Sequence, residues 1–288
     1  MTPFGIAGVQ MHVTVGSNLE AMRHRIDLVM HLYPWVQMIV FSELCVHGPL
    51  LPHAQPLPGE SEDELCTAAR RHGIWLVNGS MFERRDGHIH NTTSVIDPQG
   101  TVIGRYRKLY PFQPFEQGVT PGEAFLYWDV PGVGRFGVLN CYDIWFPENA
   151  RTLAAHGVEV ILHPVLTHTI DRDVDLCIAR ATAAMQQCYV FDINGLGAGG
   201  NGYSAVFDPH GRALYEGGGS EQFIPVEIFD NIAPETIFLI AVRNNAFQRN
   251  FRHTSLDVFL IDTGHCLMTT ETHFQIWFSL IQTYNDRL

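Results

Sequence analysis

One lysine, Lys108, stands among the 18 lysine and arginine side chains of this 288-residue chain, and all the others are arginines. Codon bias toward arginine would remove lysines wherever a guanidinium serves equally well, so the position that keeps a lysine is informative. An ammonium group is a compact point charge that can move a proton when its pKa is shifted, whereas a guanidinium stays charged. Lys108 is therefore the first candidate for chemistry.

Cys141 is the candidate nucleophile. It follows a β-type run that ends near Leu139, and Pro147 opens a predicted helix shortly after it. Such a strand-to-helix turn exposes a side chain at the end of a sheet, and the backbone N–H groups after it can face a developing oxyanion. An arbitrary cysteine is more often a buried structural thiol. The turn and the residues that accompany Cys141 favour the nucleophile.

Two carboxylates complete the candidate set. Glu43 closes the largely apolar run that starts at Met38, and Glu116 lies on the segment that follows Lys108. Taken alone, Glu43 could be an exposed loop acid or a helix cap. A thiol with a pKa of about 8.5 is mostly protonated at neutral pH, so a nucleophilic cysteine needs a base or a cation beside it. A carboxylate and an ammonium group would supply both.

Together these segments resemble the nitrilase superfamily, the carbon–nitrogen hydrolases that use a Glu-Lys-Cys triad. Phe41-Ser-Glu43 is similar to the first triad motif, Tyr106-Arg-Lys108 to the second, and Asn140-Cys-Tyr-Asp-x-x-Phe-Pro-Glu148 to the third. The resemblance covers roughly residues 4–230. It implies an α/β fold, a four-layer α-β-β-α sandwich.

The resemblance implies a catalytic triad of Glu43, Lys108 and Cys141, with Glu116 as the supporting second glutamate. Glu43 would take the thiol proton, and Lys108 and the backbone N–H of Tyr142 would stabilise the tetrahedral oxyanion. Ammonia would leave, and water would then hydrolyse the thioester. Glu116 would orient the lysine and balance its charge. This chemistry needs no metal and no organic cofactor.

Two positions depart from the family pattern. Ser42 stands where proline usually precedes the glutamate, and Trp145 replaces an arginine common in the amidase branches. The segment Lys108–Glu116 resembles the proline-rich segment of aliphatic amidases and formamidases. We therefore expect an amidohydrolase that cleaves a small non-peptide amide to a carboxylic acid and ammonia. The alternatives are a nitrilase, an N-carbamoyl amide hydrolase and a catalytically silent binding protein on the same fold.

Four aromatic side chains lie beside the proposed catalytic residues and are candidates for substrate binding: Phe112, Phe115, Tyr142 and Trp145. Ordinary core packing explains aromatic residues at these positions about equally well. The size of a substrate pocket depends on loops around 49–58, 112–122 and 195–202, whose conformations a single sequence does not determine. The substrate itself therefore stays open.

Short β-type runs alternate with helical patterns along the chain, which indicates an α/β fold. These elements must position the candidate catalytic residues. Strands are predicted at 4–13, 36–41, 74–80, 89–96, 101–106, 135–139, 159–162, 189–193, 203–207, 213–215 and 223–228, and helices at 17–32, 60–72, 147–156 and 171–187. Asp97–Gly100 and Asp208–Gly211 both read Asp-Pro-x-Gly, which is typical of a turn because proline presets φ and glycine accepts positive φ. Two similar hairpins indicate two similar sheets, and so a sandwich.

Three further patterns point to other kinds of site. Gly195–Gly200 matches G-x-G-x-x-G, but a strand and a turn follow it instead of a helix, so a mobile loop near the site is favoured over a dinucleotide site. The clusters His88–His90 and His163–His168 lack the H-E-x-x-H form, and their histidines are interpreted as surface or satisfied core groups. Arg172 and Arg180, on the helix predicted after the second cluster, are interpreted as solvated charges.

Net charge and composition limit the kinds of molecule that this chain is expected to bind. A formal charge of −12 disfavours binding to nucleic acid or to anionic membranes, so we expect a small-molecule amide or nitrile substrate. The N-terminus lacks a signal-peptide pattern, no apolar run reaches membrane-spanning length, and the six cysteines form no C-x-x-C pair. We expect a cytoplasmic protein, and the resemblance implies a homo-oligomer.

Residues 1–230 are predicted to form the catalytic domain, and 231–288 an extension that packs at a subunit interface or on its own domain.

Overall fold

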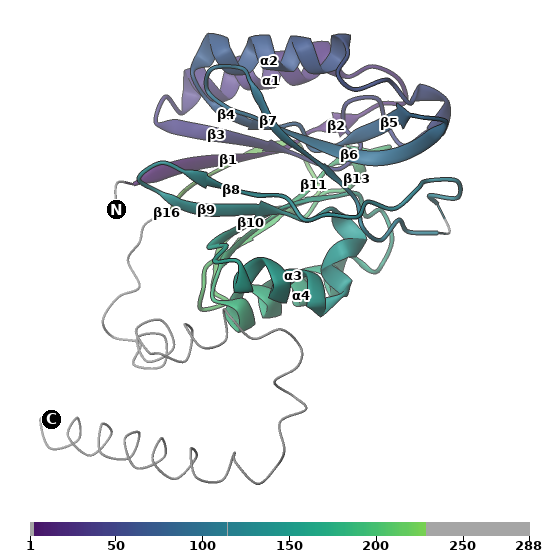
Figure 1. Ribbon diagram of the computed structural model, residues 1–288. Coiled ribbons are helices and arrows are strands. Elements are labelled where there is room, and N and C mark those ends of the chain that lie inside the picture. The colour runs from purple at the N-terminus through teal and green to yellow at the C-terminus, as the bar shows by residue number, and fades with distance from the viewer. Residues whose placement is uncertain (1–2, 114, 229–288) are drawn as a thin grey trace, which may run out of the picture. The chain divides into compact units, whose positions relative to one another are not determined.

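The computed structural model describes residues 3–113 and 115–228 (Figure 1). Within these residues strands and helices alternate along the chain, as the sequence predicts. The predicted extension over 231–288, with Cys266 in it, lies outside the described residues.

Two large sheets lie one above the other in the described part of the chain (Figure 1). The first has seven strands in the order β16-β1-β3-β4-β6-β5, with β7 also paired to β6: β1 Phe4–Gln10, β3 Val36–Phe41, β4 Trp75–Val77, β5 Met81–Arg85, β6 His88–Ile96, β7 Val102–Arg107 and β16 Gln222–Ile228. The second has six strands in the order β15-β14-β11-β10-β9-β8: β8 Tyr127–Val130, β9 Gly134–Val138, β10 Val160–Val165, β11 Tyr189–Asn194, β14 Ala205–Phe207 and β15 Ala213–Glu216. The neighbours β1, β3 and β4 are parallel, as are β9, β10 and β11, so several carboxyl ends meet at one edge of each sheet.

Helices cover the outer face of each sheet (Figure 1). The first sheet is covered by α1 Leu19–Leu32 and α2 Glu60–His72, and the second by α3 Pro147–Ala155 and α4 Arg172–Gln186; two short 3₁₀ helices, η1 Leu51–His53 and η2 Cys141–Trp145, lie in connections. The bounds of α2 follow from its charges, because acidic residues fill its first turn and basic residues its last. Gly73 then ends the helix in the left-handed conformation, at φ 65°.

Alternating side chains on β3 show how the layers pack. Ile39 and Phe41 belong to the apolar cluster that β3 shares with α1 and α2, whereas Met38 and Val40 belong to the cluster shared with the second sheet. Successive side chains of a strand point to opposite faces, so a strand between two layers is apolar throughout. The predicted four-layer α-β-β-α sandwich is confirmed.

Both Asp-Pro-x-Gly sequences form the predicted hairpins, one in each large sheet. Asp97–Gly100 joins the antiparallel strands β6 and β7, and Asp208–Gly211 joins β14 and β15. In each turn the glycine N–H donates to the aspartate carbonyl oxygen at 2.9 Å, and the glycine φ is 74°. The two Asp-Pro-x-Gly sequences therefore form the same kind of hairpin turn.

Residues 4–13 and 195–200 differ from the prediction. The first run divides into β1 and the short strand β2, His12–Val13, which leaves the large sheet. The second is not a loop: β12, Leu196–Gly197, and β13, Gly200–Asn201, form a hairpin that pairs with β2. Gly197 has φ 65°, and a Cβ there would lie 2.5 Å from the His12 ring, so the glycines allow this close pairing.

Strands β5 and β8 were not predicted from the sequence. Strand β5 ends in Arg84 and Arg85, which obscure its β character, yet Asp86-Gly87 follows with φ values of 49° and 81° and turns the chain into β6. Asp-Gly is a strong signal for a two-residue hairpin, and it could have revealed this strand.

Candidate active site

The candidate catalytic residues follow strands from both large sheets. Glu43 comes just after β3, Lys108 directly after β7, and Cys141 opens η2 after β9. The backbone N–H of Glu43 donates to the carbonyl oxygen of Val165, the last residue of β10, at 3.2 Å. This bond ties the carboxyl ends of the two sheets together, and in α/β sheets such ends are the usual place for a ligand.

Lys108 lies between two buried carboxylates. Its Nζ donates to Glu43 Oε1 and to Glu116 Oε2, at 2.7 Å in each case. The amide of Asn91 spans the same pair, because its Nδ2 lies 2.9 Å from Glu43 Oε1 and 2.8 Å from Glu116 Oε1. All four side chains are buried. The structure thus brings three of the predicted residues into one hydrogen-bonded cluster.

Burial and charge act against each other in this cluster. Burial alone would lower the pKa of Lys108, but the negative charges of Glu43, of Cys141 as a thiolate and of Glu116 hold that pKa well above its ordinary value. Burial raises the pKa of Glu43, and the Lys108 ammonium counteracts this only in part. Lys108 is therefore a fixed cation, and Glu43 is a more basic carboxylate than one in water.

The backbone at Cys141 has a left-handed conformation, with φ 47°. A residue with a Cβ adopts this conformation only where its surroundings hold it. The buried carboxylate of Asp143 does so, because it accepts hydrogen bonds from the Asn140 N–H at 3.0 Å and from the Tyr110 N–H at 2.8 Å. It also accepts from the Tyr106 hydroxyl at 2.6 Å, which connects the turn to β7.

The Cys141 thiol donates a hydrogen bond to the carbonyl oxygen of Leu166 at 3.8 Å, and the charge of the Glu43 carboxylate acts on it. Burial, and then the negative charge of Glu43, raise the pKa of this thiol well above its ordinary value, while Lys108 lowers it less strongly. The thiol is therefore protonated at rest. It becomes a nucleophile when a base removes its proton, and Glu43 is the carboxylate whose charge affects it most.

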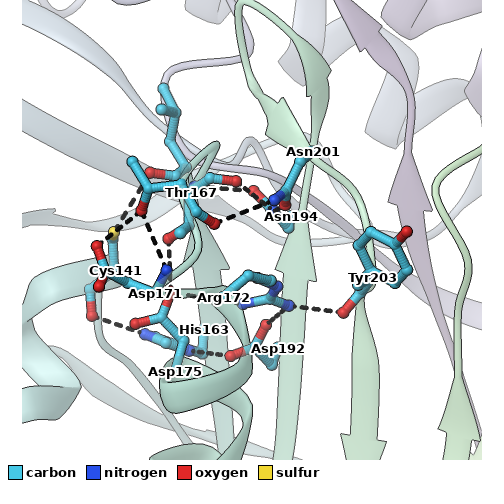
Figure 2. Close-up of polar contacts among 12 residues, drawn as sticks. Cys141, His163, Thr167, Asp171, Arg172, Asp175, Asp192, Asn194, Asn201 and Tyr203 are labelled. Atoms are coloured by element: carbon cyan, nitrogen blue, oxygen red, sulfur yellow. Dashed lines mark hydrogen bonds and ion pairs between the residues drawn. The ribbon is translucent and has the colours of Figure 1, made fainter.

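A second buried network lies behind the Cys141 backbone (Figure 2). His163 Nε2 lies 2.9 Å from the carbonyl oxygen of Cys141, and His163 Nδ1 lies 3.0 Å from Asp192 Oδ2. Asp192 also pairs with Arg172, whose Nη2 donates to the carbonyl oxygen of Tyr203 at 2.9 Å. The Arg172 side chain is only 3 % exposed, so its interpretation as a solvated charge is wrong.

Asp175 of α4 extends this network toward the surface. Its Oδ1 accepts a hydrogen bond from Trp145 Nε1 at 2.8 Å, and its Oδ2 accepts one from the Thr167 hydroxyl at 2.6 Å. Oδ2 also lies 3.9 Å from Arg172 Nη1. The Trp145 ring is thereby held at its N–H edge.

The four predicted substrate-binding residues form a continuous row of rings. The ring centroid of Phe112 lies 5.7 Å from that of Phe115 and 5.0 Å from that of Tyr142, and Tyr142 lies 6.1 Å from Trp145. Phe115 is 63 % exposed and Trp145 is 37 % exposed. Core packing is therefore wrong for these two residues, and contact with a substrate stays a prediction.

Sequence reasoning missed Asn91, Asp143 and Asp192, and it gave His163 no role. Asn91 and Asp192 lie in buried stretches of strands, and so does His163. A polar residue within the apolar strands β10 and β11 is a usable signal, because a buried polar group needs a partner, whereas Asn91 lies among other polar residues of β6. The sequence does not show which partner it finds.

The chemistry available here is that of a thiol, carboxylates and an ammonium group, which suits nucleophilic and acid–base catalysis. Within residues 3–113 and 115–228, no three His, Cys, Asp or Glu side chains are grouped so that they could hold a metal ion. In this same part of the chain, no helix combines the length and apolar character needed to cross a membrane.

Comparison with known proteins identifies relatives. The carbon-nitrogen hydrolase family matches residues 6–228. The chain is 29% identical to the 2-oxoglutaramate amidase of Bacillus subtilis (strain 168) over 235 residues, which cover 77% of this chain and 90% of that protein. It is 32% identical to an (R)-stereoselective amidase of Pseudomonas sp over 203 residues, which cover 66% of this chain and 72% of the relative.

Solved structures agree with the fold. Saccharomyces cerevisiae Nit3, a member of branch 10 of the nitrilase superfamily, superposes with a TM-score of 0.74 at 25% identity, covering 81% of this chain and 95% of Nit3. An amidase from Nesterenkonia sp. has a TM-score of 0.70 at 23% identity, covering 79% of this chain and 90% of the amidase, a likeness of fold. The chain therefore belongs to the carbon–nitrogen hydrolase family of the nitrilase superfamily and is a hydrolase that acts on C–N bonds.

Proposed function

We propose that this chain is an amidase that converts a small non-peptide amide to a carboxylic acid and ammonia through a thioester on Cys141. The observation that carries the proposal is the buried Lys108 ammonium, held 2.7 Å from each of two carboxylates beside a cysteine on a left-handed turn. The names of the relatives support an amide substrate over a nitrile or an N-carbamoyl compound, because two of those compared are amidases.

In the first step, Glu43 takes the thiol proton while the Cys141 sulfur attacks the carbonyl carbon of the amide. The carbonyl oxygen becomes an oxyanion, which the Lys108 ammonium and the backbone N–H of Tyr142 stabilise. The raised pKa of Glu43 suits this role, because a base works best when its pKa lies near the working pH.

In the second step, the protonated Glu43 gives its proton to the amide nitrogen, the C–N bond breaks, and ammonia leaves a thioester on Cys141. Water then gives a proton to Glu43 and attacks the thioester carbon. The C–S bond breaks, the acid is released, and Glu43 returns the proton to the sulfur, which restores the thiol and the carboxylate. Glu116 and Asn91 keep Lys108 and Glu43 in register through the hydrogen bonds described above.

Several expectations remain predictions around this core. The family match over residues 6–228 supports a catalytic domain over 1–230. A cytoplasmic location, a homo-oligomer and the packing of the extension over 231–288 are properties that measurements on the purified full chain and on cell fractions can decide.

The test is a panel of small amides, matched with the nitrile and the N-carbamoyl compound of the same carbon skeleton, assayed for ammonia. Acid-quenched enzyme should carry the acyl mass on the peptide that contains Cys141. Cys141→Ala should release no ammonia, whereas Cys177→Ala, which changes an exposed cysteine on α4, should keep full activity. Turnover of the nitriles without turnover of the amides, or an adduct elsewhere, would contradict the proposal.

A further inference from the structure

The carbonyl oxygen of Cys141 is the end of a buried chain of polar groups that the proposed reaction does not use (Figure 2). His163 on β10 and Asp192 on β11 are partners in the parallel register of these strands, so their side chains lie on the same face. His163 donates from Nε2 to the Cys141 carbonyl at 2.9 Å, and Asp192 is held from its other side by Arg172. Their exposed fractions are 1 % and 0 %.

The hydrogen-bond partners of His163 determine its protonation. A carbonyl oxygen can only accept, so Nε2 carries a proton. Burial would raise the pKa of Asp192, but Arg172 and then His163 bring it below its ordinary value, so this carboxylate is ionised and also only accepts. Nδ1, 3.0 Å from Asp192, therefore carries a proton as well. With both ring nitrogens protonated, His163 is an imidazolium.

The charges around this imidazolium are balanced. Asp192 faces it from β11, Asp175 and Arg172 lie on α4, and the Cys141 carbonyl faces it from η2. Two cations thus accompany two carboxylates. Burial lowers the pKa of His163, but the hydrogen bond and charge of Asp192 more than offset this and raise it.

The carbonyl that His163 binds belongs to the Cys141–Tyr142 peptide, a planar unit whose other end is the Tyr142 N–H. The first backbone bond of η2 runs from the Asp143 N–H to the Asn140 carbonyl at 3.0 Å, so the Tyr142 N–H precedes the bonds of that helix. A donor on the carbonyl fixes the plane of the peptide and draws electron density from it. Both effects make the N–H a better-aimed and stronger donor.

We propose that His163 is a positioning residue: as an imidazolium backed by Asp192 and Arg172, it orients and polarises the Cys141–Tyr142 peptide so that the Tyr142 N–H stabilises the oxyanion. The inference rests on the proposed amidase function, because the oxyanion forms in that reaction. His163 touches neither the thiol nor the substrate in this scheme. Its effect should therefore appear in kcat and leave the reactivity of the thiol unchanged.

Two substitutions separate the two contacts of His163. His163→Gln can still place a donor near the Cys141 carbonyl but carries no charge, whereas His163→Asn is too short to reach it. We expect kcat for the best amide to fall about a hundredfold in the second, the lower end of the range for a lost oxyanion donor, and only about tenfold in the first, which keeps a donor. KM should stay within about threefold. His72→Gln, in the His72–Asp27 pair of the outer helices, is the matched control and should behave as wild type.

Two further readouts distinguish positioning from a general structural role. The rate of Cys141 modification by methyl methanethiolsulfonate, which has no carbonyl group, should match wild type in both variants. The ¹⁵N spectrum of labelled histidine should show both His163 nitrogens protonated at pH 7, with the signals identified by their absence from His163→Gln. This spectrum is taken on the wild-type protein, and either His163→Gln or His163→Asn can identify the signals, so one folded variant is enough to decide the protonation.

The outcomes separate this inference from the proposed function. A neutral His163, unchanged kcat in His163→Asn, or a parallel fall in kcat and thiol modification would overturn the inference while wild-type amidase activity stands. Absence of ammonia release by the wild type from every amide would overturn both the proposed function and this role of His163.

Discussion

Lys108 Nζ lies 2.7 Å from Glu116 Oε2, and both side chains are buried, with exposed fractions of 2 % and 6 %. The Glu116 carboxylate is itself held by the Phe112 N–H at 2.6 Å. Because Glu43 binds the same ammonium from its other side, the position of Nζ is determined by two fixed oxygens. This geometry explains why position 108 keeps a lysine: two fixed oxygens leave room for a compact ammonium group.

Replacing Lys108 by arginine tests that reason. Lys108→Arg keeps the charge, but a guanidinium is larger and planar, and it does not fit between carboxylates placed for a point charge. We expect kcat/KM to fall at least about a hundredfold, or about 2.7 kcal/mol of transition-state stabilisation. Arg107→Lys, in the half-buried pair with Glu83, is the control and should change kcat/KM less than about threefold. Full activity of a folded Lys108→Arg protein would refute the role of the ammonium.

The two glutamates should differ in what their loss removes. Glu43→Gln removes the proposed base for the thiol, and we expect kcat to fall at least about a hundredfold, the scale of general acid–base catalysis. Glu116→Gln leaves that base in place and weakens only the hydrogen bond between position 116 and Lys108. The kcat of this variant should therefore lie between the values for Glu43→Gln and wild type. Steady-state kinetics on one amide, with thermal unfolding as a check of the fold, measures both. Equal effects of the two changes would contradict the division of roles.

Among the described cysteines, Cys141 should react fastest with iodoacetamide. This reagent carries the amide group that the site is proposed to bind, and Glu43 can take the thiol proton. Cys45 and Cys188 are buried, and burial raises the pKa of Cys188 to about 12. Cys177 is exposed on α4 and belongs to no part of the proposed site, so Cys177→Ser should leave the main labelling rate unchanged. Peptide mass spectrometry over a time course reads the order, and faster labelling of another cysteine in the native protein would remove Cys141 from the site.

The stability of the protein should depend on pH through His163. Its folded pKa is raised, chiefly because Asp192 more than offsets the effect of burial, and Asp175, Arg172 and the Cys141 carbonyl also face it. A raised folded pKa means that the folded state holds the proton more tightly, so the stabilisation is full below the unfolded pKa of about 6.5. It is lost as the pH rises through the folded pKa. The difference in unfolding free energy between wild type and His163→Gln, from urea titrations at several pH values, should therefore shrink above about pH 6.5. A difference that stays constant or grows would show that His163 is neutral.

Much of the fold could be predicted because its signals are local. The predicted helix over 60–72 and the predicted strand over 36–41 agree with α2 and β3 at both ends. Charges in the first and last turns and a glycine after the helix need no distant contact to act. Strand β12 shows the limit, since the glycine-rich segment that contains it becomes a strand by pairing with β13 and with the distant β2.

The sequence by itself determined the family and identified the side chains proposed to react, because a lone lysine, a cysteine at a strand end and three ordered motifs are visible in a single chain. Only the tertiary structure decided what surrounds them. Asn91 joins Glu43 to Glu116, and His163 meets Asp192 because β10 and β11 pair in one particular register. A shift of one residue would turn His163 to the other face. The physical reason is that a hydrogen bond between distant residues depends on strand pairing, which the whole core specifies and no local pattern records.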